Sequence, residues 1–167
     1  EERTPLEVTK TFRFGSNSDT VSIGYRIHNK HDRPVDLHFG IELVFGGFTF
    51  PATESAIETD DKGILQAEVE AAVMEKHRFA ISSNLYDCQA GFALDQPATI
   101  WSHPLWTVSL SEGGFEKVYQ GLIVLPHWRF KLAAGKEWKL GMEFFSRLRK
   151  KNPLNQPQPA ASGQLPT

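Results

Sequence analysis

The feature that most constrains this fold is the regular alternation of apolar and polar side chains. Alternation with a period of two places successive side chains on opposite faces of an extended strand. The clearest case spans residues 35–45, where every second residue is apolar: Val35, Leu37, Phe39, Ile41, Leu43 and Phe45. At about 3.3 Å per residue, this stretch predicts one strand of about 36 Å.

A second pair of alternating stretches predicts a hairpin. Residues 6–14 alternate, and residues 21–28 place Val21, Ile23, Tyr25 and Ile27 on one face. Between them lies 15–19, a run of Gly, Ser, Asn and Asp that is typical of tight turns. These residues therefore predict two antiparallel strands joined by a turn.

The rest of the chain also reads as strands. Residues 65–73 suit a helix by propensity and a strand by alternation, and the neighbouring strands favour the second reading. Pro126 is expected to break or bulge its strand, because proline cannot donate to a ladder. The remaining predicted strands are 78–81, 91–94, 99–101, 105–110, 117–130 and 137–145. Together these strands predict an all-β fold, an antiparallel two-sheet β-sandwich formed by residues 1–148.

Composition excludes several classes of protein. With 167 residues and a net charge of −2, the chain suits one soluble domain with no nucleic-acid or membrane partner. The Pro- and Gln-rich tail, residues 149–167, is expected to be disordered. The single Cys88 reads as a small buried hydrophobe and favours a reducing compartment, so we expect a cytoplasmic location.

Patterns that would carry catalysis or bind a cofactor are weak. The six His residues are dispersed, and although His28 and His38 could meet across a sheet, no third ligand accompanies them. The acidic stretch 54–75 lacks the spacing of a calcium loop. Glu112 and Glu116 could approach each other across a turn, but no cleft with unlike environments surrounds them. The sequence therefore predicts a non-catalytic domain without a metal or organic cofactor.

One region resembles a known family. The motif consists of Thr107-Val108-Ser109, then Ser111-Glu112-Gly113-Gly114-Phe115-Glu116, then Tyr119-Gln120-Gly121. It is similar to the C-terminal region of glycoside hydrolase family 57 enzymes, the 4-α-glucanotransferase and α-amylase group. Looser matches are the strand segments 25–29 and 39–42 and the aspartate Asp87.

This resemblance implies both a fold and a role. The family's C-terminal region is a β-sandwich of the galactose mutarotase-like kind, packed against an N-terminal (β/α) barrel that carries the catalytic residues. Nothing in this sequence matches that barrel. The resemblance thus implies a non-catalytic accessory domain of an α-glucan-processing enzyme, with the catalytic barrel and α-glucan as expected partners. The alternative is an independent carbohydrate-binding module for α-glucans.

Two sets of candidate residues follow. Carbohydrate modules stack sugars on exposed aromatic rings, and the candidates for that contact are Trp101, His103, Trp106 and Trp128. Core burial is favoured for Trp106 and Trp138 and evenly balanced against exposure for Trp101 and Trp128. The motif turn is the candidate for docking the barrel, through Glu112, Phe115, Glu116, Tyr119 and Gln120. Exposure of three tryptophans on one face would favour the binding module.

Overall fold

The computed structural model describes residues 5–16, 18–46, 55–60, 64–66, 70–83, 86–111 and 113–149. Within these ranges the chain forms ten strands and no helix, and hence no helix able to span a membrane. The strands are β1 (Leu6–Phe14), β2 (Thr20–Asn29), β3 (Val35–Gly40), β4 (Leu43–Phe45), β5 (Ser55–Thr59), β6 (Ile64–Gln66), β7 (Ala71–Ser83), β8 (Cys88–Ser111), β9 (Gly114–Leu132) and β10 (Glu137–Leu148). The predicted disordered residues 150–167 lie outside the described ranges, so that expectation stays a prediction.

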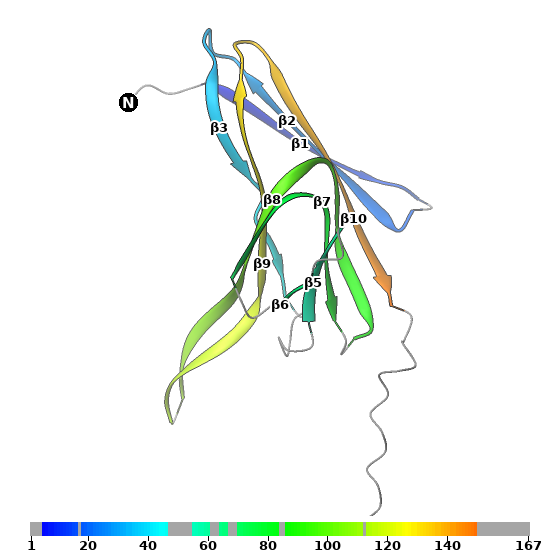
Figure 1. Ribbon diagram of the computed structural model, residues 1–167, viewed down its shortest axis with the longest axis vertical. Coiled ribbons are helices and arrows are strands. Elements are labelled where there is room, and N and C mark those ends of the chain that lie inside the picture. The colour runs from blue at the N-terminus through cyan, green and yellow to red at the C-terminus, as the bar shows by residue number, and fades with distance from the viewer. Residues whose placement is uncertain are drawn as a thin grey trace, which may run out of the picture.

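All strand pairs are antiparallel, and the two layers are continuous through β8. One layer has the order β1-β2-β10-β8-β7-β5-β6, while β3 and β4 pair with β9, which in turn pairs with β8. Residues 88–94 of β8 pair with β10, and residues 99–111 pair with β9. Figure 1 shows β7 and β8 arching over between the two parts. The predicted all-β antiparallel fold is confirmed, as is the hairpin of β1 and β2.

The 24-residue strand β8 replaces the three short strands predicted within it. Two prolines lie within this strand, and each falls where a ladder is incomplete. Pro97 lies between the last residue paired with β10, Leu94, and the first paired with β9, Thr99. Beyond Ser102 the strand β7 ends, so Pro104 has a neighbour on one side only. Proline is tolerated at such edges because no N–H is needed there.

The long strand predicted over residues 35–45 is wrong in one respect, because it is divided into β3 and β4. Gly40 pairs with His127 and Leu43 with Val124, so the register is the same on both sides of the break. The break falls opposite Pro126, whose carbonyl still accepts a hydrogen bond from the Ile41 N–H at 3.0 Å. Pro126 therefore interrupts the strand paired with it, which is divided into β3 and β4, while β9 continues through Pro126.

The core lies between the two layers and is built by the apolar halves of the alternating strands. Its fully buried members are Ile57, Phe79, Ile81, Ile100, Leu122, Val124, Leu140 and Met142. A Cβ on Gly91 would lie 2.2 Å from the Phe79 carbonyl oxygen, so β7 and β8 approach too closely there for any side chain.

Asn29 joins two turns in the interior. Its side chain is fully buried at the end of β2, and its amide Nδ2 lies within hydrogen-bonding distance of three carbonyl oxygens: those of Arg33, Leu132 and Ala133, at 2.9, 3.1 and 3.2 Å. Its Oδ1 accepts a hydrogen bond from the His31 N–H at 3.0 Å. One side chain thus holds the β2–β3 turn against the β9–β10 turn.

Candidate functional site

Trp101 and His103 lie together, as their spacing of two on β8 requires. Trp101 is 40% exposed and His103 is also exposed. Both line a shallow hollow of about 480 Å³, whose other walls are Glu70, Ala71, Ala72 and Ser102. The hollow presents an indole ring next to an imidazole and a carboxylate, which are groups that can contact a sugar through its ring face and its hydroxyls.

A pair of histidines supports Trp101 from β9 and β3. The His127 ring lies 4.2 Å from the Trp101 ring, centroid to centroid, and its Nδ1 lies 2.9 Å from Nε2 of His38. His38 therefore meets His127 and not His28, because β3 pairs with β9 while β2 pairs with β1 and β10. Burial lowers the pKa of His127, and the neighbouring His38 and Arg129 lower it further. A neutral imidazole thus packs against the indole.

The described residues offer neither a metal site nor an activated thiol. In the part of the chain that the structure describes, no three His, Cys, Asp or Glu side chains lie close enough to hold a metal ion. Cys88 is half-buried at the start of β8, and burial raises the pKa of its thiol, with Asp87 adding to the shift. A raised pKa leaves little thiolate at neutral pH.

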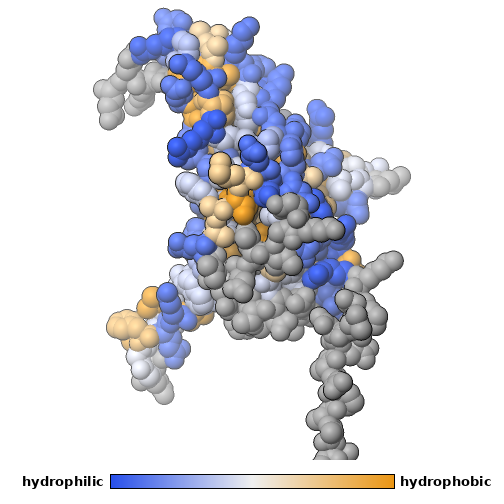
Figure 2. Space-filling model, viewed as in Figure 1, coloured by the Kyte–Doolittle hydropathy of each residue, from blue (hydrophilic) through white to orange (hydrophobic). Residues whose placement is uncertain are grey.

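The paired ends of β8 and β9 form an arm that extends from the rest of the strands (Figure 1). In the arm, residues 106–111 of β8 pair with residues 114–119 of β9. Register and alternation give one face Trp106, Val108, Leu110, Phe115, Lys117 and Tyr119. Phe115 is 82% exposed and Leu110 76% exposed, and Figure 2 shows apolar atoms along this arm. We call these six residues the apolar face of the arm.

Contacts within the arm order its base. Trp106 packs edge-on against Tyr119 at 5.1 Å, and Lys117 Nζ lies 5.4 Å from the Trp106 ring centroid. On the opposite face, Gln120 Nε2 donates to Thr107 Oγ1 at 3.0 Å. The prediction that Trp106 is buried in the core is wrong, because 38% of its surface is exposed at the base of the arm. Two candidate residues of the motif turn remain to be placed. Glu116 lies opposite Ser109 on the paired strand, and Glu112 lies outside the described residues.

The three candidate tryptophans do not share a face. Trp128 is only 8% exposed, so the expectation that its ring could lie exposed and contact a sugar is wrong. Instead it packs on Phe39 and Trp138 in the core. Trp138 is half-buried against that core, which agrees with the favoured interpretation. Trp101 and Trp106 stand five residues apart on β8, and this odd spacing directs them to opposite faces. The register shift after Leu105 leaves Gln120 of β9 unpaired in the ladder, while every β8 residue from 101 to 106 stays paired.

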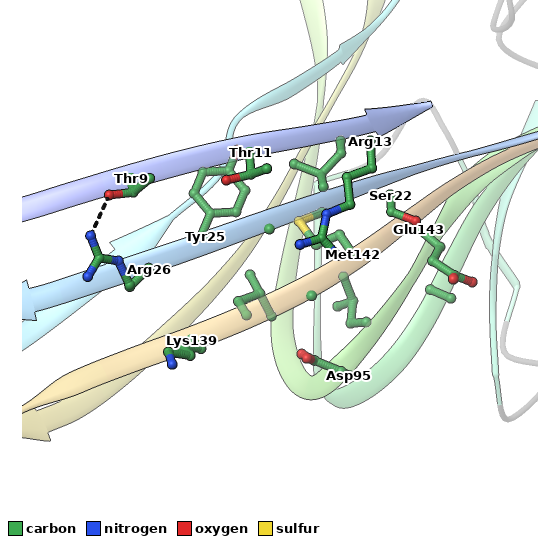
Figure 3. Close-up of a pocket in the computed structure, with 16 residues that line it drawn as sticks. Thr9, Thr11, Arg13, Ser22, Tyr25, Arg26, Asp95, Lys139, Met142 and Glu143 are labelled. Carbon is green, nitrogen blue, oxygen red and sulfur yellow. Dashed lines mark hydrogen bonds between the residues drawn. The ribbon is translucent and has the colours of Figure 1, made fainter. Parts of the chain in front are cut away.

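A groove that sequence reasoning missed crosses the outer face of β1, β2, β10 and β8. It has a volume of about 660 Å³. Figure 3 shows Arg13, Asp95 and Glu143 projecting from different strands around it. Its floor includes Gly24 and Gly141, which are paired across β2 and β10. The available signal was two glycines at polar positions within alternating strands, where a missing side chain opens space.

Comparisons with known proteins agree on one family. A sequence model of the C-terminal region of α-amylases and 4-α-glucanotransferases matches residues 2–142. α-Amylase 1 of Dictyoglomus thermophilum is 29% identical over 142 residues, which is 84% of this chain and 20% of that protein. The chain thus spans about a fifth of the length of the curated relative that it matches.

Solved structures place the fold. The 4-α-glucanotransferase of Thermococcus litoralis superimposes with a TM-score of 0.59 at 20% identity, over 87% of this chain and 19% of that one. A putative aldose 1-epimerase of Escherichia coli K12 superimposes with a TM-score of 0.64 at 10% identity, over 89% of this chain and 62% of that one. At these identities the likeness shows a common fold, the galactose mutarotase-like β-sandwich that the family resemblance implied.

Proposed function

Because this chain belongs to the family of α-amylase/4-α-glucanotransferase C-terminal domains, we propose that it is the non-catalytic accessory domain of an α-glucan-processing enzyme of glycoside hydrolase family 57. In such an enzyme the reaction takes place in a (β/α) barrel elsewhere in the polypeptide. The match to one-fifth of an α-amylase supports this division of labour. The domain's role is to support the barrel and to contact glucan beside it.

The apolar face of the arm is the observation that carries this proposal. Phe115 and Leu110 are cross-strand partners near the tip, and both leave most of their surface in water. Contiguous exposed apolar side chains usually mark a contact with another protein surface. The same residues include part of the motif that resembles the family, so the catalytic barrel is the partner that best accounts for them.

A reconstitution experiment tests the docking. The catalytic barrel of the parent enzyme and this chain would be produced separately, and the melting temperature of the barrel measured with and without the chain. We expect the chain to raise it, and the Leu110→Asp variant to abolish the rise because a carboxylate would be buried. Val118→Asp places the same charge on the opposite face, across from the neutral Thr107, and is the matched control. An equal effect of both variants, or no rise at all, would contradict the docking role.

A second candidate function is α-glucan binding at the Trp101 hollow. The partly exposed indole next to His103, backed by neutral His127, favours it. Titration of the chain with maltoheptaose should change the tryptophan fluorescence. Trp101→Ala should remove that change, whereas Trp106→Ala on the opposite face should retain it. A flat response of the unmodified chain would exclude this function.

A further inference from the structure

We propose that the groove on the outer face of β1, β2, β10 and β8 is a binding site for a neutral oligosaccharide, separate from the Trp101 hollow. The identification of the ligand as an α-glucan rests on the proposed function. The existence of the site rests on the floor, the walls and the charges of the groove.

The floor is open because two glycines lie side by side. Thr11, Gly24 and Gly141 occupy one row across β1, β2 and β10. Neither glycine has a φ in the left-handed region, so their backbone conformation is accessible to any residue. At the end of the row, Asp95 Oδ2 lies 2.8 Å from the position that a Cβ on Gly141 would occupy. The missing side chains therefore leave a flat floor of backbone with a carboxylate over one end.

One wall of the groove is fixed by ion pairs. It is the row of Thr9, Arg26 and Lys139. The Arg26 guanidinium donates to Glu137 Oε1 at 2.6 Å, to Glu7 Oε1 at 2.9 Å and to Thr9 Oγ1 at 3.2 Å. These contacts use three of the five N–H donors of Arg26 within the protein and hold its side chain in place, so this wall contributes mainly shape to the site.

The opposite wall carries side chains available to a ligand. It is the row of Arg13, Ser22, Glu143 and Ala93, on β1, β2, β10 and β8. The side chains of Arg13, Glu143 and Asp95 make no hydrogen bond or ion pair with another residue that the structure describes, and all three residues are exposed. One guanidinium and two carboxylates thus point into solvent around the floor (Figure 3).

This arrangement selects the ligand's chemistry. Because charges of both signs line the groove, a simple anion attracted by Arg13 and Lys139 is also repelled by Asp95 and Glu143, and the reverse holds for a simple cation. A hydroxyl group suits both kinds of side chain, since it accepts from a guanidinium and donates to a carboxylate. The backbone floor can receive the C–H face of a sugar, and about 660 Å³ lies within the range of ligand sites. A polyhydroxylated neutral chain meets all these conditions.

The test is calorimetric titration of the chain with maltoheptaose. Gly24→Val should weaken binding at least tenfold by filling the floor. Its Cβ would lie 4.0 Å from that of Thr11, an ordinary contact, and valine suits a strand. Arg13→Gln and Asp95→Asn alter exposed side chains without changing packing, and each should weaken binding severalfold. Ser109→Val adds a β-branched side chain on the arm and should bind as the unmodified chain does.

Each outcome decides the proposal. Full binding of maltoheptaose by Gly24→Val, or by both polar variants, would overturn the proposal. If Gly24→Val has a lower melting temperature than the unmodified chain, the two polar variants decide alone. Binding lost in Trp101→Ala and kept in all groove variants would place the glucan at the hollow and also overturn it. Absence of maltoheptaose binding by the unmodified chain would overturn the proposed binding site in the groove. The reconstitution with the barrel tests the accessory role independently of this result.

Discussion

Replacement of Asn29 should destabilise the domain more than any other single polar substitution among its turns. The residue is fully buried, and its side chain bonds to backbone groups of the adjacent turn and of a second turn 103 and 104 positions further along the chain. No sequence-local contact can compensate for its loss.

The magnitude follows from its hydrogen bonds. The amide group has two N–H donors shared among three carbonyl oxygens, and Oδ1 accepts a further bond from the His31 N–H. Three hydrogen bonds at about 0.5–1.5 kcal/mol each give about 3 kcal/mol for Asn29→Ala. That loss corresponds to a fall in melting temperature of about 6–12 °C for a domain of this size.

Urea denaturation followed by circular dichroism measures this free energy of unfolding. Asn29→Asp provides a sharper version, because a carboxylate would face three carbonyl oxygens. Burial and those oxygens raise the pKa of the new carboxyl, so its cost relative to the unmodified chain should be greater at pH 7 than at pH 4.5. Lys136→Ala, at an exposed position of the β9–β10 turn, is the control and should change stability by less than about 0.5 kcal/mol. An Asn29→Ala loss below about 1 kcal/mol would refute the claim that Asn29 holds the two turns together.

Two further predictions concern buried positions. Burial lowers the pKa of His127 from 6.5, so as the pH falls below 6.5 the unfolded chain takes up a proton that the folded chain resists. The free energy of unfolding should therefore decline on acidification in this window, and His127→Gln should reduce the decline; equal slopes would contradict it. Gly91→Ala should cost about 1–3 kcal/mol through the clash with the Phe79 carbonyl, whereas Gly24→Ala should be nearly neutral, as thermal melting of the two variants would show. Similar melting temperatures would disprove the close approach of β7 and β8 there.

The matches to the family acquire physical meaning from the structure. The segment 25–29 ends in Asn29 because that position must bond to two turns. Asp87, a looser match, has a φ of 49°, in the left-handed region that aspartate tolerates better than most residues, and its carbonyl accepts a hydrogen bond from the Arg149 N–H at 2.7 Å. These matched residues therefore serve the fold, while Leu110 and Phe115 of the arm are exposed and available to a partner.

The sequence established that the chain is built of strands, that residues 6–14 and 21–28 form a hairpin, and that Tyr25 and Ile27 face inward, because alternation is a local property with a period of two. It also brought Trp101 and His103 together, since they share one face of one strand. Which strands continue through prolines depends on the three-dimensional arrangement, because a strand can continue only where no neighbour needs the missing N–H. Burial of Trp128 and exposure of Trp106 likewise depend on where the second layer ends. The groove required the pairing of Gly24 with Gly141, residues 117 positions apart in the chain, which no local pattern specifies.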